Sequence, residues 1–323
     1  MTRPLALQAT GLCTPAPGDQ AEQVAALLAG RPLFRRHPRW IGSDGQRQIM
    51  AYVPELEEVR DFPARCALLL HRAYRDCLAD QRARGLDPAP RPLVVLLPPP
   101  LRPDAMRDAF RAAAAQLDFG GVTDVRLVFG DATAVVPVLD MMRDSSPAGP
   151  AYVAAVDSQV TPFMLDFLAA SGLARDRLAR WNPIPAEASA CLLLSTDQGP
   201  ARLLDWAGTR EPEDLRNPRR GLLGRGLCEA IDAVTSRRGT SLSQVIVDGG
   251  PERWRAEETG IVASEFAHLA GDVPWFHLSR SAGDLGAASA LISVAIAARL
   301  SESSLVLAST RSGGRAAAIV STE

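Results

Sequence analysis

Three short segments of this chain place carboxylates or hydroxyls where they could do acid–base or nucleophilic chemistry. Asp131 and Thr133 lie at the start of a predicted helix, so the neighbouring carboxylate could activate the Thr133 hydroxyl as a nucleophile. Asp248 follows a short apolar strand, and Asp284 begins an apolar helix. Two carboxylates held close together can divide acid and base roles, because their pKa values are driven apart.

Each of these residues also has a purely structural interpretation. Asp and Thr are favoured N-cap residues, Asp248-Gly249 is a common turn dipeptide, and an acidic residue stabilises the first turn of a helix. An N-cap needs no partner base, whereas a threonine nucleophile does. The structural interpretation is therefore the simpler one, and catalysis by these groups is the alternative.

The composition excludes several functional classes. The chain has 323 residues with 47% hydrophobic content and a net charge of −2, which suits a large core and gives no sign of a nucleic-acid partner. All 35 basic residues are Arg, so a lysine nucleophile or Schiff base is excluded. The four histidines lack metal-ligand spacing, and we expect neither a metal nor a cofactor.

The cysteines and the apolar segments indicate a cellular location. The five cysteines form no Cys-x-x-Cys pair, and their odd number without a spacing pattern predicts reduced, buried thiols in the cytoplasm. The N-terminus lacks the apolar region of a signal peptide. The longest apolar helix, at about 285–300, is too short to span a bilayer, so we expect no membrane insertion.

Apolar runs and helical segments alternate along the whole chain. The order β-α-β-α-β-α-β-β occurs twice, in residues 1–199 and 200–323, with an irregular, Arg-rich insertion at about 31–60. This alternation predicts an α/β protein whose parallel sheets are covered on both faces. The expected strands are 5–11, 92–99, 125–129, 151–156, 189–195, 201–207, 245–247, 274–278, 304–309 and 316–321. The expected helices are 20–30, 64–85, 104–117, 132–143, 161–172, 226–238, 253–266 and 285–300.

Several stretches resemble β-ketoacyl synthases and other thiolase-fold enzymes. The segment Gly283-Asp284-Leu285-Gly286-Ala287-Ala288-Ser289-Ala290 is similar to the family's Gly-His-x-x-Gly-Ala-Ala-Gly motif, with one residue fewer before the second Gly. Further similar stretches follow in the family's order, at 7–30, 152–157, 186–194, 226–250 and 305–320. The resemblance implies a thiolase-like fold of two similar halves in α-β-α-β-α layers, and a homodimer formed by strand pairing.

The same resemblance implies that the catalytic residues are missing. The family's Asp-Thr-Ala-Cys stretch matches residues 131–134, which places Ala134 at the nucleophile position within about one residue. Asp248-Gly249-Gly250 stands where the first catalytic histidine is expected, and Asp284 replaces the second. The family's lysine matches Arg280, which keeps the charge. Condensation needs an activated thiolate and two groups that polarise the thioester, and these positions supply neither.

The region after the first lost histidine also departs from the family. Residues 250–258 are bulky and charged where the family has a small Gly-Thr-Gly-Thr loop, and we expect Trp254 and its flanking arginines to fill the former substrate tunnel. In the family both histidine loops face one pocket, so Asp248 and Asp284 are expected to converge. Asp131, Thr133, Trp254 and Arg280 are the other candidate residues of that pocket.

These observations are compatible with three functions. The first is a catalytically inactive β-ketoacyl-synthase-like protein that acts as a protein-binding partner or adaptor, in a bacterial secretion or biosynthetic gene cluster. The second is an acyltransferase or hydrolase that uses altered residues in the old pocket. An enzyme requires side chains that converge in an open pocket, whereas an adaptor is expected to have that pocket filled and its charges capped. A third function, a sensor of small molecules or acyl carriers, requires an open tunnel.

Overall fold

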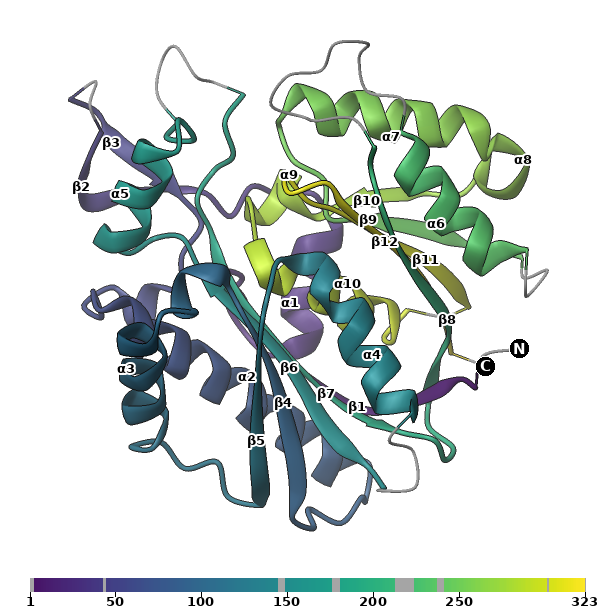
Figure 1. Ribbon diagram of the computed structural model, residues 1–323, viewed down its shortest axis with the longest axis horizontal. Helices are drawn as coiled ribbons and strands as arrows, with labels where there is room; N and C mark the ends of the chain where they lie inside the picture. The colour runs from purple at the N-terminus through teal and green to yellow at the C-terminus, as the bar shows by residue number, and fades with distance from the viewer. Residues whose placement is uncertain are drawn as a thin grey trace.

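Strands and helices alternate in the computed structural model, which describes residues 3–42, 45–144, 149–175, 181–212, 224–236, 241–300 and 302–322 (Figure 1). The elements before residue 200 are β1 (Leu5–Cys13), α1 (Gln20–Leu28), β2 (Arg35–Ile41), β3 (Arg47–Met50), η1 (Pro54–Leu56), α2 (Phe62–Ala83), β4 (Arg91–Leu97), η2 (Pro99–Leu101), α3 (Asp104–Ala114), β5 (Val122–Phe129), η3 (Ala132–Ala134), α4 (Val135–Asp144), β6 (Ala151–Ser158), α5 (Pro162–Ala170) and β7 (Glu187–Ser195), where η marks a 3₁₀ helix. The elements after it are β8 (Ala201–Arg210), α6 (Arg225–Thr235), β9 (Gln244–Val247), α7 (Arg253–Glu265), α8 (Ala267–Ala270), β10 (Trp275–His277), α9 (Leu278–Ala282), η5 (Gly286–Ala288), α10 (Ser289–Ala297), β11 (Ser303–Ser309) and β12 (Gly314–Ser321).

Ten of the described strands form one sheet that contains the same strand order twice. The sheet runs β10-β9-β11-β12-β8-β1-β7-β6-β4-β5. Each half therefore has its third strand at the edge, then the second, fourth, fifth and first. The two halves meet where β1 and β8 pair antiparallel. The duplicated α/β order expected from the sequence is thus confirmed. The expected boundary between two domains, at residues 199 and 200, falls in the turn from β7 to β8 and stays a prediction.

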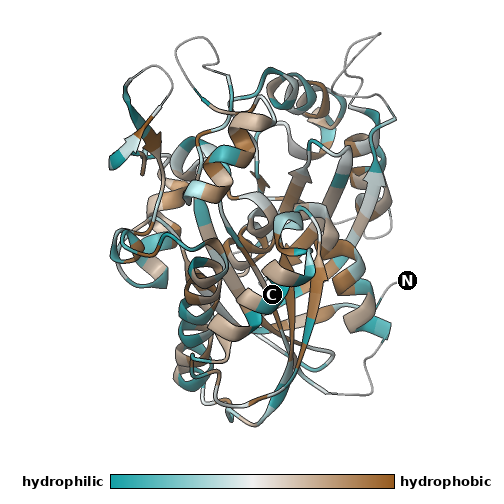
Figure 2. Ribbon diagram, turned by 60° about the vertical axis from the view of Figure 1, so that its left-hand side comes forward, coloured by the Kyte–Doolittle hydropathy of each residue, from teal (hydrophilic) through white to brown (hydrophobic). Residues whose placement is uncertain are grey.

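Three apolar cores lie between the helix and sheet layers of the molecule. One packs α2 and α3 on the first strand set, and another packs α6 and α7 on the second set. Between them, α4 and α10 pack against strands of both sets, and every residue of α10 is buried. The cores and Figure 1 together give five layers, helix–sheet–helix–sheet–helix. Figure 2 shows the apolar colour following the strands through these layers.

Strand alternation explains how one strand can serve two cores. In β4, Leu93, Val95 and Leu97 face α2, whereas Val94 and Leu96 face the central layer. Successive side chains of a strand point to opposite faces, so a continuous apolar run is what a strand covered on both faces requires.

The insertion at 31–60 was expected to be irregular, and this expectation was wrong. Its described residues contain the antiparallel hairpin β2–β3 and the 3₁₀ helix η1. The pairing register shifts between Arg36 and Ile41, and Pro38 lies within that shift, so period-two alternation is interrupted and the strands are hard to recognise in sequence. Met50 and Tyr52 pack with Val160, and this small core joins the hairpin to the start of α5 (Figure 1).

Two expected helices begin as 3₁₀ turns. The helix expected at 132–143 starts as η3 and continues as α4, whose first turn contains Pro137. The helix expected at 285–300 starts as η5 and continues as α10. Both tight turns lie at the candidate catalytic positions, and they contact each other.

The cysteines are all unpaired. Four are buried and Cys228 is half-buried, so the expected burial holds for all but this one. Burial raises the pKa of the Cys13 thiol to about 12 and that of Cys66 and Cys77 well above the ordinary value. Within the described residues, no helix is long and apolar enough to cross a membrane.

Candidate functional site

The position expected for a nucleophile lies in η3, directly after β5. Ala134 packs its methyl group against the central apolar core. Asp131 caps this turn, since its Oδ1 accepts hydrogen bonds from the Thr133 backbone N–H at 3.1 Å and from the Thr133 hydroxyl at 2.6 Å. Its Oδ2 accepts a hydrogen bond from the Ser312 hydroxyl, in the turn between β11 and β12. Both oxygens of Asp131 are therefore already engaged, and no thiol stands here.

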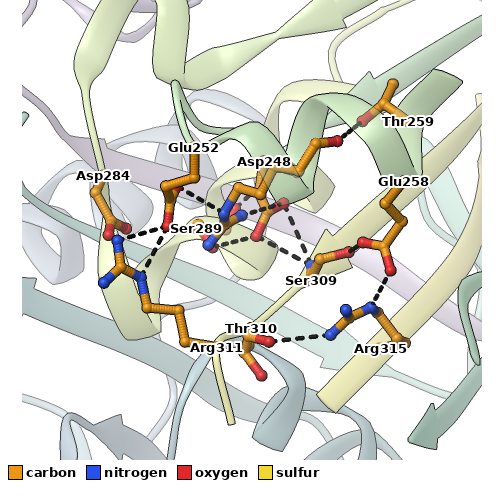
Figure 3. Close-up of polar contacts among 12 residues, drawn as sticks. Asp248, Glu252, Glu258, Thr259, Asp284, Ser289, Ser309, Thr310, Arg311 and Arg315 are labelled. Carbon is orange, nitrogen blue, oxygen red and sulfur yellow. Dashed lines mark hydrogen bonds and ion pairs between the residues drawn. The ribbon is translucent and has the colours of Figure 1, made fainter. Parts of the chain in front are cut away.

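Asp248 occupies the position after β9 and is bound on several sides. The side chain is buried, and its Oδ1 lies 3.1 Å from Nη1 of Arg255, while the Ser289 hydroxyl and the Ser309 N–H donate to it at 3.3 Å (Figure 3). Burial raises the pKa of Asp248, and the Arg255 guanidinium opposes this rise. Asp248 is thus held as the acidic member of a buried ion pair.

Arg255 links Asp248 to the start of α7. Its Nε lies 3.0 Å from a carboxylate oxygen of Glu252, and Glu252 also pairs with Arg311 at 2.6 Å. Burial alone would lower the pKa of Arg255, but the charges of Asp248 and Glu252 raise it above its ordinary value. Removal of either carboxylate would leave a buried cation without full compensation.

Asp284 caps the turn that leads into α10. Its Oδ1 accepts the Gly286 N–H at 3.0 Å, and its own N–H donates to the Ile184 carbonyl at 2.9 Å. Gly283 and Gly286 have φ angles of +77° and +54°, where residues with a Cβ are strained. A Cβ on Gly286 would lie 2.0 Å from Oδ2 of Asp157. The glycines of this motif therefore serve the close approach of the turn to β6 and β7.

Asp157, near the end of β6, is a buried carboxylate that was not among the candidate site residues expected from the sequence. Its Oδ2 accepts the Ala287 N–H at 2.9 Å, whereas its Oδ1 accepts no hydrogen bond of ordinary geometry from the residues that the structure describes. Burial raises the pKa of Asp157 to about 7, despite the Ala287 hydrogen bond, and the nearby charge of Asp284 raises it further. An acidic residue at the end of an apolar strand was the only sequence signal.

The structure does bring the expected positions together. The turn that contains Ala134 contacts the turn that begins at Gly286, and Asp248 reaches Ser289 at the start of α10. The charge of Asp284 raises the pKa of both Asp157 and Asp248, so both of these carboxylates lie within electrostatic range of Asp284. Among the described residues, no group of His, Cys, Asp and Glu is arranged to hold a metal ion.

The ring of Trp254 lies close to the guanidinium groups of two arginines. The guanidinium carbons of Arg255 and Arg315 lie 4.8 and 5.2 Å from the centre of its ring. Arg315 is fully buried and pairs with Glu258, which also accepts the Ser309 hydroxyl at 2.6 Å (Figure 3). The charged segment after β9 thus forms a packed ion-pair network. Neither Arg255 nor Arg315 was selected as an ion-pair residue from the sequence, because their partners are set by the fold.

A pocket of about 580 Å³ lies beside this network. Gly249, Gly250, Arg255, His277 and Arg280 are part of its wall, whereas Ala134, Asp284 and Trp254 are not. His277, expected to be a packed strand residue, is half-buried and faces this pocket. Of the candidate residues, Gly249 and Arg280 therefore share one cavity, and the former nucleophile position does not line it.

Similarity to solved structures identifies the fold. No family model matches the chain, and no curated protein sequence matches it. The ishigamide ketosynthase/chain length factor matches with a TM-score of 0.71 and 15% identity over 100% of both chains. The thiolase-like ketosynthase fold is therefore the fold of this chain.

Two further solved structures share this fold. The AntDE:AntF complex, a type II PKS acyl-carrier protein with its ketosynthase, matches with a TM-score of 0.73 and 12% identity over 100% of both chains. ChlB3, described as an acyltransferase, matches with a TM-score of 0.60 and 17% identity over 99% of this chain and 98% of that one. At identities this low, the structural matches establish the ketosynthase-like fold alone. The function has to be argued from the site.

Proposed function

We propose that this chain is a catalytically inactive β-ketoacyl-synthase-like protein that acts as a protein-binding partner or adaptor. The observation that carries the proposal is the state of the three former catalytic positions. Ala134 has no nucleophilic group, Asp248 is bound to Arg255, and Asp284 caps its own turn. Attack on a thioester requires an activated nucleophile and donors aimed at the developing oxyanion, and these positions supply neither.

The outer face of the β2–β3 hairpin supports a binding role. In the register of the hairpin, Arg36 is opposite Ile49 and Ile41 is opposite Arg47. Directly opposite residues of an antiparallel pair project from the same face. All four side chains are exposed, with Ile41 58% and Ile49 39% accessible. Exposed isoleucines alternating with arginines fit a partner surface that is apolar and acidic.

The neighbouring helix α5 extends the apolar character of this corner. Phe163 and Phe167 are four residues apart, so they share one helix face, and they are 43% and 47% exposed. Leu165 of the same helix packs against the hairpin core of Met50 and Tyr52. We name the exposed residues Arg36, Ile41, Arg47 and Ile49 the hairpin face and propose it as the partner-binding surface.

Capture from the native host tests this surface. The tagged protein and an Ile41→Ser/Ile49→Ser variant are purified in parallel, with Asp108→Asn, an exposed change on α3, as the matched control. We expect a stoichiometric protein partner with the wild type and the control, and at least tenfold less of it with the hairpin variant. Recovery of the same partner in equal amount with the hairpin variant would refute the assignment. Wild-type protein recovered alone would contradict the adaptor role itself.

We also propose a homodimer that forms through β5. This strand is at the sheet edge and pairs only with β4 in the described part of the chain, and its Val125 is 49% exposed. Antiparallel pairing about Val125 would place Asp124 of one copy opposite Arg126 of the other, which complements their charges. Sedimentation equilibrium should therefore give twice the chain mass of 34.5 kDa.

An acyltransferase or hydrolase with altered residues is the second candidate. The pocket beside Gly249 favours it, because an open cavity of this size lies next to the buried carboxylate of Asp248. ChlB3, which shares the fold, is described as an acyltransferase. We further propose a cytoplasmic location, which the five unpaired cysteines support.

A further inference from the structure

The pocket of about 580 Å³ lies where two parallel strands end, which is a favoured position for ligands in α/β proteins. β9 and β10 pair in parallel, and Gly249 and His277, at or just beyond their C-terminal ends, both line the wall. Small-molecule sites are commonly about 300–1,000 Å³. The cavity is thus large enough for a ligand of moderate size, which a protein-binding role alone would not require.

Among the described residues that line the wall, the charged groups are all basic. Arg175, Arg255 and Arg280 line the pocket together with His277, and this described part of the wall contains no Asp or Glu. Arg255 is neutralised by Asp248 and Glu252. Arg175 donates to the Asn182 carbonyl at 2.7 Å, and in the described part of the chain neither Arg175 nor Arg280 lies within ion-pair distance of a carboxylate. Two positive charges therefore face the cavity without a compensating carboxylate among the residues that the structure describes.

The titration of these groups agrees with that excess of positive charge. Burial lowers the pKa of Arg175, and no carboxylate in the described segments opposes this change. Burial also lowers the pKa of His277, and the charge of Arg280 lowers it further. A bound anion would act in the opposite direction on both groups, because an opposite charge favours the protonated form.

Much of the rest of the wall is apolar. Phe34, Trp181 and Trp275 contribute aromatic rings, and Thr259 and Ser279 add hydroxyl groups. Aromatic side chains together with guanidinium groups suit a ligand that stacks one flat face and pairs one negative charge.

We propose that this pocket binds a small organic anion, in which a carboxylate, sulfonate or phosphate is joined to a flat apolar group. The anionic group pairs with Arg175 and Arg280, and the flat group lies against Trp275. This inference goes beyond the proposed adaptor role, because it concerns a small-molecule ligand and the hairpin face takes no part in it.

A fluorescence titration with 1-anilinonaphthalene-8-sulfonate tests the site, since this probe combines a sulfonate with flat rings. Arg175→Gln and Arg280→Gln are compared with Arg253→Gln, a matched control whose side chain is exposed on α7 and pairs with Glu257. We expect each pocket variant to weaken binding of the probe at least fivefold and the control to leave it unchanged. We also expect the uncharged analogue N-phenyl-1-naphthylamine to bind at least tenfold more weakly than the sulfonate.

A second measurement separates binding in the pocket from binding elsewhere. In the wild type, the NMR titration of His277 should move to higher pH when the probe saturates the protein. Thermal unfolding of each variant shows that the fold is intact. Equal affinity of the wild type and both pocket variants, or an unmoved His277 titration, would overturn the proposal without affecting the adaptor role.

Discussion

Replacement of Glu187 by Gln is expected to lower the free energy of unfolding by about 3–5 kcal/mol, because it breaks a fully buried ion pair. The Glu187 carboxylate receives two hydrogen bonds from Arg65, at 2.6 and 2.7 Å, and both side chains are at most 3% exposed. It also accepts the Val53 N–H and the Ser158 hydroxyl. Arg65 in turn donates to the Leu56 and Val59 carbonyls, so one carboxylate ties the insertion to the sheet.

Urea denaturation of wild type and Glu187→Gln measures this loss. Glu55→Gln is the matched control, because Glu55 makes an ion pair of 3.3 Å with Arg72 at the surface, where both side chains are more than a third exposed. Such exposed pairs contribute about 0–1 kcal/mol. A loss below about 1 kcal/mol for Glu187→Gln would show that this pair does not anchor the insertion.

Replacement of Asp157 by Asn is expected to stabilise the protein strongly at pH 8 and much less at pH 5. The folded protein holds the Asp157 proton up to a pKa of about 7, against an ordinary value of 3.8, so folding favours the protonated form. The stability from this group is fully present below the ordinary pKa and is lost as the pH rises through about 7. One pKa unit corresponds to about 1.4 kcal/mol, so the cost of the ionised form approaches about 4 kcal/mol above neutral pH.

Thermal and urea unfolding between pH 5 and pH 8 check this expectation. The variant keeps an oxygen for the Ala287 N–H but has no ionisable group, so its advantage should grow across this range to about 2–4 kcal/mol. Asp166→Asn, an exposed change on α5, serves as the control. An advantage of Asp157→Asn that is independent of pH would mean that the carboxylate is ionised throughout.

Much of the fold could be predicted because its strands carry their own pattern. The apolar runs of β4 and β6 are bounded by turn residues, and a strand covered on both faces needs such a run. The glycines of residues 283–286 could be recognised as a motif, and their positive φ angles explain why. The hairpin β2–β3 could not be recognised, because Pro38 and the register shift interrupt its alternation.

The site was less predictable than the fold, because its chemistry depends on long-range partners. The family resemblance implies that Asp248 and Asp284 lie near each other, and in the structure the charge of Asp284 does raise the pKa of Asp248. It does not indicate that Arg255 neutralises Asp248, because that pairing requires the first turn of α7 to fold back over β9. Asp157 was missed because only the approach of residues 286–287, far along the chain, buries it.

We propose above all that this protein, despite its ketosynthase-like fold, catalyses no reaction of acyl thioesters. The most direct measurement incubates the purified protein with acetyl and malonyl thioesters of N-acetylcysteamine and follows thiol release and acyl products by mass spectrometry. We expect the wild type to consume these thioesters no faster than buffer alone, and we expect the same of Asp248→Asn and Asp284→Asn. Catalysed consumption of a thioester that either substitution abolishes would contradict it and would establish the altered acyltransferase or hydrolase instead.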